Sequence, residues 1–256
     1  MNSIIHHETE MTIARRQITD KLYHQANAFV YLVILQMLGY LLAANGMMSG
    51  SGSEHFSYTV HTISSVPLFF FTILWMILQG LHLAGEKSRE YYLVSNHFVA
   101  YFSDIAVLEI YGVVAGVTLL LAEPFLQILA SLFYDPVILE PSFLQVGVGN
   151  QFILFLTGTL YFLMFGAGAY TVGILRARFK FRFFMGVVLA VLLIIIASMV
   201  RTRLVGAPYV IHLDQLAAFY YQETRWAIWL MKMVVTIGLF YGISYLGMRN
   251  LEVNER

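Results

Sequence analysis

The sequence predicts an all-α integral membrane protein with six transmembrane helices. Hydrophobic residues make up 59% of the 256 residues and charged residues only 12%, so a water-soluble fold could not keep its surface solvated. Several apolar runs are long enough, at about 1.5 Å per residue, to cross roughly 30 Å of hydrocarbon as helices. Cysteine is absent, which excludes disulfides and thiolate chemistry.

Six apolar windows define the expected spans within a single transmembrane domain, residues 1–256. These spans cover residues 28–44, 62–83, 99–121, 151–175, 183–200 and 226–246. The first span is short and carries Gln36, and a five-span protein without it would have its termini on opposite sides. With six spans, eleven of the fifteen Lys and Arg residues fall on the side of the termini, so both termini are expected in the cytoplasm.

Residues 10–24 precede the first span and mix isoleucine and leucine with Arg15, Arg16 and Lys21. This mixture predicts an N-terminal amphipathic interfacial helix that lies in the inner headgroup layer. A solvated tail is the alternative.

Three longer links are expected on the outer side: residues 45–61, 123–145 and 201–225. The first contains Gly50-Ser-Gly-Ser53, which is typical of a flexible linker. The other two carry apolar residues at helical spacing, so we expect short extracellular or re-entrant helices there. An ordinary structured loop is the alternative for each.

Two ionisable residues fall within the expected hydrocarbon layer. Glu109 lies near the middle of the third span and Lys232 lies in the outer half of the sixth, at similar depths. A pair of opposite charges would offset part of the cost of burying either one, and could line a transport route. Alternatively, Lys232 reaches the outer interface and Glu109 is protonated or bonded to backbone and hydroxyl groups. Asp104, near the inner end of the third span, is expected in the interfacial layer.

Glycines four residues apart occur in two spans. Gly112 and Gly116 lie in the third span, and Gly238 and Gly242 lie in the sixth. Such pairs let two helix backbones approach closely where lipid provides no hydrophobic drive, so they predict helix packing within the chain or in an oligomer.

A search for catalytic and metal-binding motifs gives little support to the hypothesis of an enzyme. The sequence has no G-x-x-x-x-G-K-[ST] loop for nucleotide phosphates and no H-E-x-x-H zinc motif. We therefore expect no catalytic residue, no metal site and no cofactor in this chain. The formal net charge of zero gives no basic field that would favour nucleic acid as a partner.

The inner link between the second and third spans has the composition of a docking surface. Residues 86–98 combine charged residues with apolar anchors: Glu86, Lys87, Arg89, Tyr91, Tyr92, Leu93 and Phe98. We expect this segment to be a cytoplasmic coupling loop that binds a partner protein. A solvated turn with aromatic residues at the headgroup level is the alternative.

Several short patterns together resemble the small six-helix permease subunits of bacterial ABC-type exporters, especially a group from Gram-positive bacteria. They are the amphipathic entry helix, Tyr58-Thr-Val before the Trp75-containing span, Tyr91-Tyr-Leu-Val-Ser95-Asn96-His97 with Ser103-Asp104, the Gly112 and Gly116 helix, and Gly173-Ile-Leu-Arg-Ala-Arg178. Members of this group tend to have Asn-Arg where this chain has Asn96-His97.

The resemblance implies a permease in the bacterial cytoplasmic membrane that works with a separate ABC-type ATPase subunit. That partner would bind ATP and Mg, and a second permease subunit, identical or different, would complete the transporter. Aromatic and methionine-rich spans suit a hydrophobic or amphipathic cargo, such as a lipid, a drug or a peptide. The alternatives are a membrane scaffold or immunity-type protein without transport and, less favoured, an intramembrane enzyme.

Overall fold

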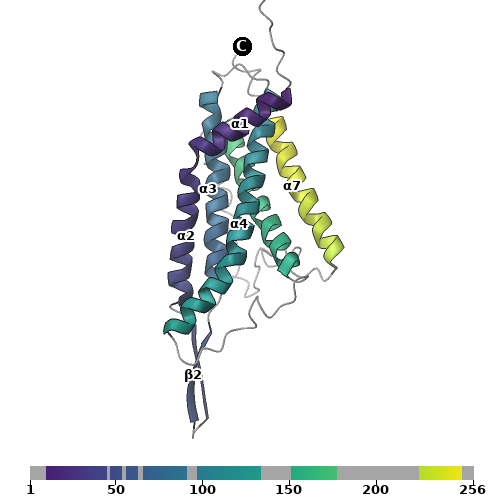
Figure 1. Ribbon diagram of the computed structural model, residues 1–256. Helices are drawn as coiled ribbons and strands as arrows, with labels where there is room; N and C mark the ends of the chain where they lie inside the picture. The colour runs from purple at the N-terminus through teal and green to yellow at the C-terminus, as the bar shows by residue number, and fades with distance from the viewer. Residues whose placement is uncertain are drawn as a thin grey trace, which may run out of the picture. The chain divides into compact units, whose positions relative to one another are not determined.

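The computed structural model describes residues 10–44, 47–53, 56–62, 66–90, 97–133, 151–177 and 225–249. Its helices are α1 (Glu10–His24), α2 (Asn27–Ala44), α3 (Val66–Glu90), α4 (His97–Phe133), the helix Gln151–Ala177 and α7 (Trp226–Arg249) (Figure 1). The chain forms two compact units, Met1–Tyr170 and Thr171–Arg256, each of which is described separately. The expectation of a single transmembrane domain stays a prediction.

Four of these helices are long and apolar enough to cross a membrane, which identifies an integral membrane protein. The candidate spans are Val66–Gly85, Phe98–Ala122, Gln151–Ala177 and Trp226–Met248. They match four of the six expected spans closely. The predicted span 183–200 lies outside the described residues.

The first predicted span corresponds to α2, which passes the same test only together with α1. The two helices form a pair bent by 50° between Met11–His24 and Asn27–Ala43. Backbone hydrogen bonds continue through the bend, because the N–H groups of Gln25, Ala26 and Ala28 donate to Lys21, Tyr23 and Gln25. The bend therefore leaves these polar backbone groups paired, as a low-dielectric surrounding requires.

In the first unit, α2, α3, α4 and the first part of helix Gln151–Ala177 alternate in direction. We call the end where α1 lies the α1 end, and the opposite end, where α2 stops and α3 begins, the hairpin end (Figure 1). Trp75, Tyr111, Phe162 and Tyr170 are fully buried and form the centre of this unit. Its interior is therefore built around large aromatic side chains.

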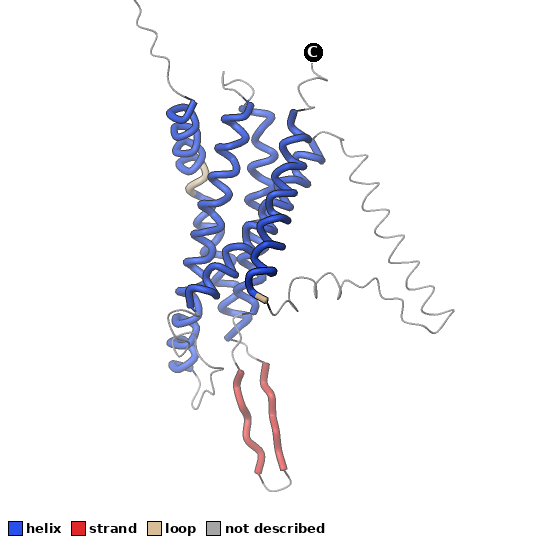
Figure 2. Tube along the Cα trace, turned by 90° about the vertical axis from the view of Figure 1, so that its right-hand side faces the viewer, coloured by secondary structure: helices blue, strands red, loops and turns tan. Residues whose placement is uncertain are grey.

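A β-hairpin joins α2 to α3 and corrects the expectation of a flexible linker in an all-α protein. Strand β1 (Met47–Ser53) pairs antiparallel with β2 (Phe56–Thr62), with Met47 opposite Thr62 (Figure 2). The sequence of β2, Phe-Ser-Tyr-Thr-Val-His-Thr, has an aromatic or β-branched residue at every second position from Phe56 to Thr62, which favours a strand. The second span consequently begins at Val66 rather than residue 62, with Pro67 in the first helical turn, where proline is tolerated.

Helix α4 extends to Phe133, beyond its candidate span. The expected separate helix after residue 123 is, as far as Phe133, a continuation of α4 that contains Pro124. Proline removes one backbone donor and clashes with the preceding turn, and this end of α4 turns aside in Figure 1. Phe125 then packs edge-to-face on Tyr40 of α2, with 5.2 Å between ring centroids.

Glycines set the distance between α3, α4 and helix Gln151–Ala177. A Cβ atom added at Gly80 would collide with the carbonyl oxygen of Gly166 and lie 3.0 Å from the backbone nitrogen of Tyr170. On α4, a Cβ at Gly112 would lie 2.5 Å from Leu163, and one at Gly116 would collide with Thr159. At Gly80 the backbones of two helices touch, and at Gly112 and Gly116 side chains of the facing helix occupy the space. Both kinds of contact are possible only because glycine has no side chain.

Replacement of Gly80 by Ala should therefore destabilise the protein, because overpacking against a backbone carbonyl cannot be relieved by a side-chain rotation. The expected loss is about 1–3 kcal/mol, measured as a lower midpoint of thermal unfolding in detergent. The matched control is Gly85→Ala on the same helix, where an added Cβ meets nothing within 4 Å. That variant should be neutral or more stable, since alanine is the better helix former by up to ~1 kcal/mol. Equal effects of the two substitutions would contradict the described crossing.

Candidate functional site: a buried charged cluster

A buried ion pair connects α1 to α4 in the first unit. The Nζ atom of Lys21 lies 2.5 Å from Oδ1 of Asp104 and donates a second hydrogen bond, 2.7 Å long, to Oγ of Ser103. The side chain of Lys21 is 9% exposed and that of Asp104 is 2% exposed. Tyr170, on helix Gln151–Ala177, donates from its hydroxyl to Oδ2 of Asp104 at 2.7 Å. We call these four residues, Lys21, Ser103, Asp104 and Tyr170, the Lys21 cluster.

The hydrogen bonds of the Lys21 cluster have a consistent direction. Both carboxylate oxygens of Asp104 accept, one from the ammonium group and one from a phenol. Ser103 accepts from Lys21 and donates to the carbonyl oxygen of Ala100 at 2.7 Å. This arrangement suits an ionised Asp104 facing a charged Lys21, because each charge is neutralised by its partner and further stabilised by a polar neighbour.

Local structure brings the cluster together. Ser103 and Asp104 lie in the second turn of α4, at the α1 end, and the lysine is in the last turn of α1. The bend after His24 directs α1 across that end, where it packs on α4 (Figure 1). An α1 that continued straight from α2 would carry Lys21 away from Asp104.

Two further polar contacts hold the bend itself. The hydroxyl of Tyr111 on α4 donates to Oε1 of Gln25 at 2.9 Å, and the indole N–H of Trp75 on α3 donates to the carbonyl oxygen of Ala28 at 2.8 Å. Tyr111 also contacts the rings of Trp75 and Phe29, with centroids 5.4 Å and 5.5 Å apart. The junction of α1 and α2 is thus fixed by α3 and α4 together.

Gln36, the polar residue that weakened the expectation of a first span, is buried inside the bundle. Its side-chain amide donates to Oγ1 of Thr118 at 2.9 Å and approaches Oγ1 of Thr72 at 3.4 Å. The two threonine hydroxyls in turn donate to carbonyl oxygens of their own helices. A glutamine paired in this way is compatible with an apolar surrounding and links α2 to its neighbours.

The residues predicted to dock a partner fall at the α1 end where the structure describes them. Glu86, Lys87 and Arg89 belong to the last part of α3, which continues to Glu90 beyond the span that ends at Gly85. Phe98 lies at the start of α4 and is exposed. Tyr91, Tyr92 and Leu93 lie outside the described residues. The first part of the predicted coupling loop is therefore helical.

The candidate intramembrane pair is divided between the two units. Glu109 is exposed on α4, in the first unit, and Lys232 is half-buried on α7, in the second. Their pairing stays a prediction.

The four predicted packing glycines have different surroundings. Gly112 and Gly116 lie at the crossing of α4 and helix Gln151–Ala177, as described above. A Cβ at Gly238 or Gly242 on α7 would meet no atom of the described residues within 4 Å. The contact that the second unit does show involves a different glycine, Gly247, where a Cβ would lie 3.1 Å from Ile174.

Asp104 and Lys21 are the site residues that the sequence analysis missed. It placed Asp104 in the interfacial layer and Lys21 at the headgroup level, which stay predictions, but it did not expect either side chain to be buried or the two to pair. A usable signal was present: an acidic residue in an apolar span, with a basic residue in the predicted helix that precedes the first span. Tyr170 gave no signal, because four of the six expected spans contain tyrosine, two residues in each.

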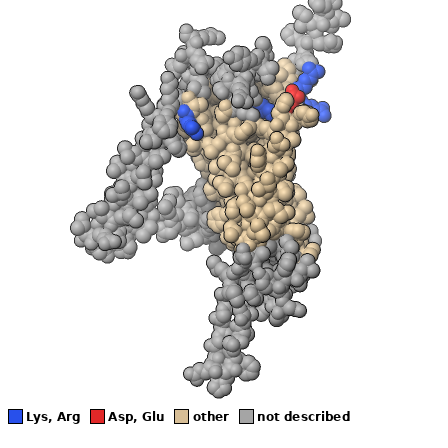
Figure 3. All heavy atoms as spheres, turned by 90° about the vertical axis from the view of Figure 1, so that its left-hand side faces the viewer, with Lys and Arg blue, Asp and Glu red and all other residues tan. Residues whose placement is uncertain are grey.

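The arrangement connects α1, α4 and helix Gln151–Ala177. Both charged groups have hydrogen-bond partners, and Ser103 donates to a backbone carbonyl oxygen. Within the described ranges, no group of three or more His, Asp or Glu residues lies together as metal ligands would. On the face shown in Figure 3, the coloured Lys, Arg, Asp and Glu side chains lie toward one end, and the tan surface below them is uncharged.

Comparisons with family models, with curated proteins and with solved structures found no match to this chain. Inferences about its function therefore depend on its own residues and on their arrangement.

Removal of one charge of the Lys21–Asp104 pair should destabilise the protein by about 3–5 kcal/mol, because the other charge is left buried without compensation. Asp104→Asn and Lys21→Met should each lower the unfolding midpoint in detergent. The double variant should recover much of the loss, since it also removes the desolvation cost.

Arg15→Met is the matched control, because Arg15 is an exposed cation on the same helix. It should change stability by less than about 0.5 kcal/mol. If the stability losses of the two single variants add up to the loss of the double variant within about 0.5 kcal/mol, the two side chains act independently, which would contradict the structure.

Proposed function

We propose that this chain is the membrane-spanning permease subunit of an ABC-type exporter that moves a hydrophobic or amphipathic cargo. Energy would come from a separate ATPase subunit that binds ATP and Mg, because the chain has no nucleotide-binding loop of its own. A second permease subunit, identical or different, would complete the transporter. The resemblance noted in the sequence and the arrangement at the α1 end support this proposal.

The observation that carries the proposal is the position of the Lys21 cluster next to the predicted docking segment. Asp104 lies seven residues after His97, the first residue of α4, a distance of about 10 Å along the helix. A force applied to residues 86–98 would act on α4 at this point. The ion pair and the Tyr170 hydrogen bond would then pass the displacement to α1 and to helix Gln151–Ala177.

Helix α3 supports the same function. Its candidate span ends at Gly85, but the helix continues for five more residues to Glu90, about 7.5 Å. This extension carries Glu86, Lys87 and Arg89 away from the apolar layer, where a soluble partner could contact them. A rigid extension transmits a push from such a partner better than a flexible loop would.

The proposal places the α1 end, both termini and the docking segment in the cytoplasm of a bacterial cell, with the chain in the cytoplasmic membrane. The excess of Lys and Arg on that side supports this orientation. In it, α1 lies at the inner membrane surface, and the β-hairpin lies outside.

The orientation can be tested directly, because the chain contains no cysteine of its own. Single cysteines at Ser88 and Ala177 should be protected from a membrane-impermeant thiol reagent in intact cells and should react after the cells are opened. A cysteine at Ser51, in β1, should react in intact cells. Labelling at Ala177 from outside would reverse the orientation and remove the proposed docking surface.

The coupling role can be tested by Tyr91→Ala combined with Tyr92→Ala. The purified complex from gentle detergent should contain an ATPase with a phosphate-binding loop. The double variant should weaken its binding by roughly thirtyfold, because lost aromatic anchors at an interface commonly cost ~2 kcal/mol or more.

Tyr91→Phe combined with Tyr92→Phe is the control, which keeps both rings and should retain the ATPase. Unchanged ATPase binding and turnover in the alanine variant would exclude these residues from coupling. Failure of any such ATPase to co-purify with the unmodified chain would contradict the proposed function itself.

A further inference from the structure

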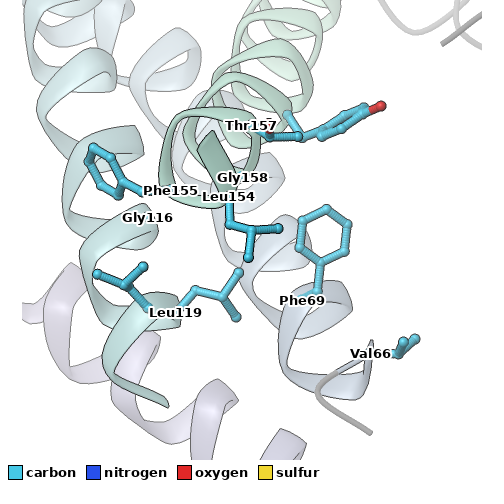
Figure 4. A pocket seen from close by; sticks show the side chains of 10 residues that line it. Val66, Phe69, Gly116, Leu119, Leu154, Phe155, Thr157 and Gly158 are labelled. Carbon is cyan, nitrogen blue, oxygen red and sulfur yellow. The ribbon is translucent and has the colours of Figure 1, made fainter. Parts of the chain in front are cut away.

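A cavity of about 290 Å³ lies at the hairpin end of the first unit, among α3, α4 and helix Gln151–Ala177. Its wall is almost wholly apolar and includes Val66, Phe69, Gly116, Leu119, Leu154 and Gly158 (Figure 4). Hydroxyl groups enter the lining only through Thr157 and Tyr161, and no charged residue contributes to it. This chemistry excludes an ionic ligand and favours a hydrocarbon.

The cavity exists because a glycine lies where a side chain would fill it. A Cβ atom at Gly158 would have its nearest neighbours, Leu119 and Phe162, at 3.9 Å, which is ordinary van der Waals contact. At Gly80, Gly112 and Gly116 the missing side chain instead lets another chain segment move in. Gly158 therefore keeps space open, whereas the other three glycines permit close contact.

The position of the cavity determines what can enter it. Val66 begins its candidate span, Leu154 is the fourth residue of another, and Leu119 lies in the last turn of a third, so all three are at the hydrocarbon edge. Val66 and Leu154 are half exposed, which leaves the cavity open to the surrounding membrane at these residues. In this layer the abundant molecules of matching chemistry are hydrocarbon chains.

Leaving this apolar cavity empty or filling it with water is unfavourable. Its lining loses dispersion contacts when no atoms face it. Water finds too few polar partners on an apolar wall, and a buried apolar cavity of roughly 150 Å³ is known to stay dry yet to bind benzene. The larger volume here accommodates several carbon atoms of a flexible chain.

We propose that this cavity binds one hydrocarbon chain, inserted from the membrane past Val66 and Leu154. The chain belongs either to a bilayer phospholipid or to a single-chain amphiphile. This inference concerns binding and requires neither ATP nor a partner subunit, so it goes beyond the proposed function and can fail or succeed independently of it.

The test uses two probes with the same mid-chain diazirine: a fatty acid, and a phospholipid that carries this fatty acid as one acyl chain. The purified full-length chain is irradiated with each probe in nanodiscs, and cross-linked peptides are located by mass spectrometry. Labelling should concentrate on the cavity-lining segments around Phe69, Leu119 and Leu154. Labelling by the phospholipid alone would identify a bilayer lipid as the occupant, and labelling by the fatty acid would identify a single-chain amphiphile.

Gly158→Leu should fill the cavity and reduce labelling of these segments to the level of the rest of the membrane surface. Gly158→Ala, which the contacts at 3.9 Å allow without strain, should reduce the labelling partially. This smaller variant keeps the test valid if Gly158→Leu does not fold. Gly85→Leu is the control, because it adds the same side chain at an open position of α3 outside the cavity and should change nothing. Undiminished labelling in both Gly158 variants, or labelling spread evenly over all helices, would overturn the proposal.

Discussion

The position of α1 depends on the ion pair between Lys21 and Asp104. Neither charge can be solvated by hydrocarbon, and the two side chains are only 9% and 2% exposed, so each requires the other in place. That requirement fixes the bend between α1 and α2, which Gln25 and Ala28 then stabilise through Tyr111 and Trp75. The α1 end of the first unit is therefore organised by polar contacts, although most of its surface area is apolar.

Elsewhere in the first unit, glycines determine how closely the helices pack. Where Gly80 meets Gly166 and Tyr170 of helix Gln151–Ala177, the two backbones come into direct contact. Where Gly158 faces Leu119, the same residue type leaves a cavity. A glycine in a membrane helix thus has two opposite effects on packing, and the neighbouring helix determines which one occurs.

The membrane spans were predictable from the sequence, and the contacts between particular residues were not. Four apolar windows matched candidate spans within a few residues, because about twenty consecutive apolar residues leave few alternatives to a membrane helix. The β-hairpin was missed because Gly50 to Ser53 were interpreted by composition, although the alternation from Phe56 to Thr62 indicated a strand. The pairing of Lys21 with Asp104 depends on the direction of α1 after the bend, which no local pattern encodes. Likewise, the sequence identified Gly112 and Gly116 by their spacing but could not show that Gly158 would border a cavity.

The separation of the Lys21 cluster along the chain has a consequence for biosynthesis. Lys21 and Asp104 are 83 positions apart, and Tyr170 follows Asp104 by another 66. The chain is made from its N-terminus, so α1 is complete well before Asp104 leaves the ribosome, and Asp104 leaves it before Tyr170. During this interval the lysine must remain in contact with water or lipid headgroups. Docking of α1 on α4 therefore cannot precede the synthesis of Asp104, and Tyr170 completes the cluster later.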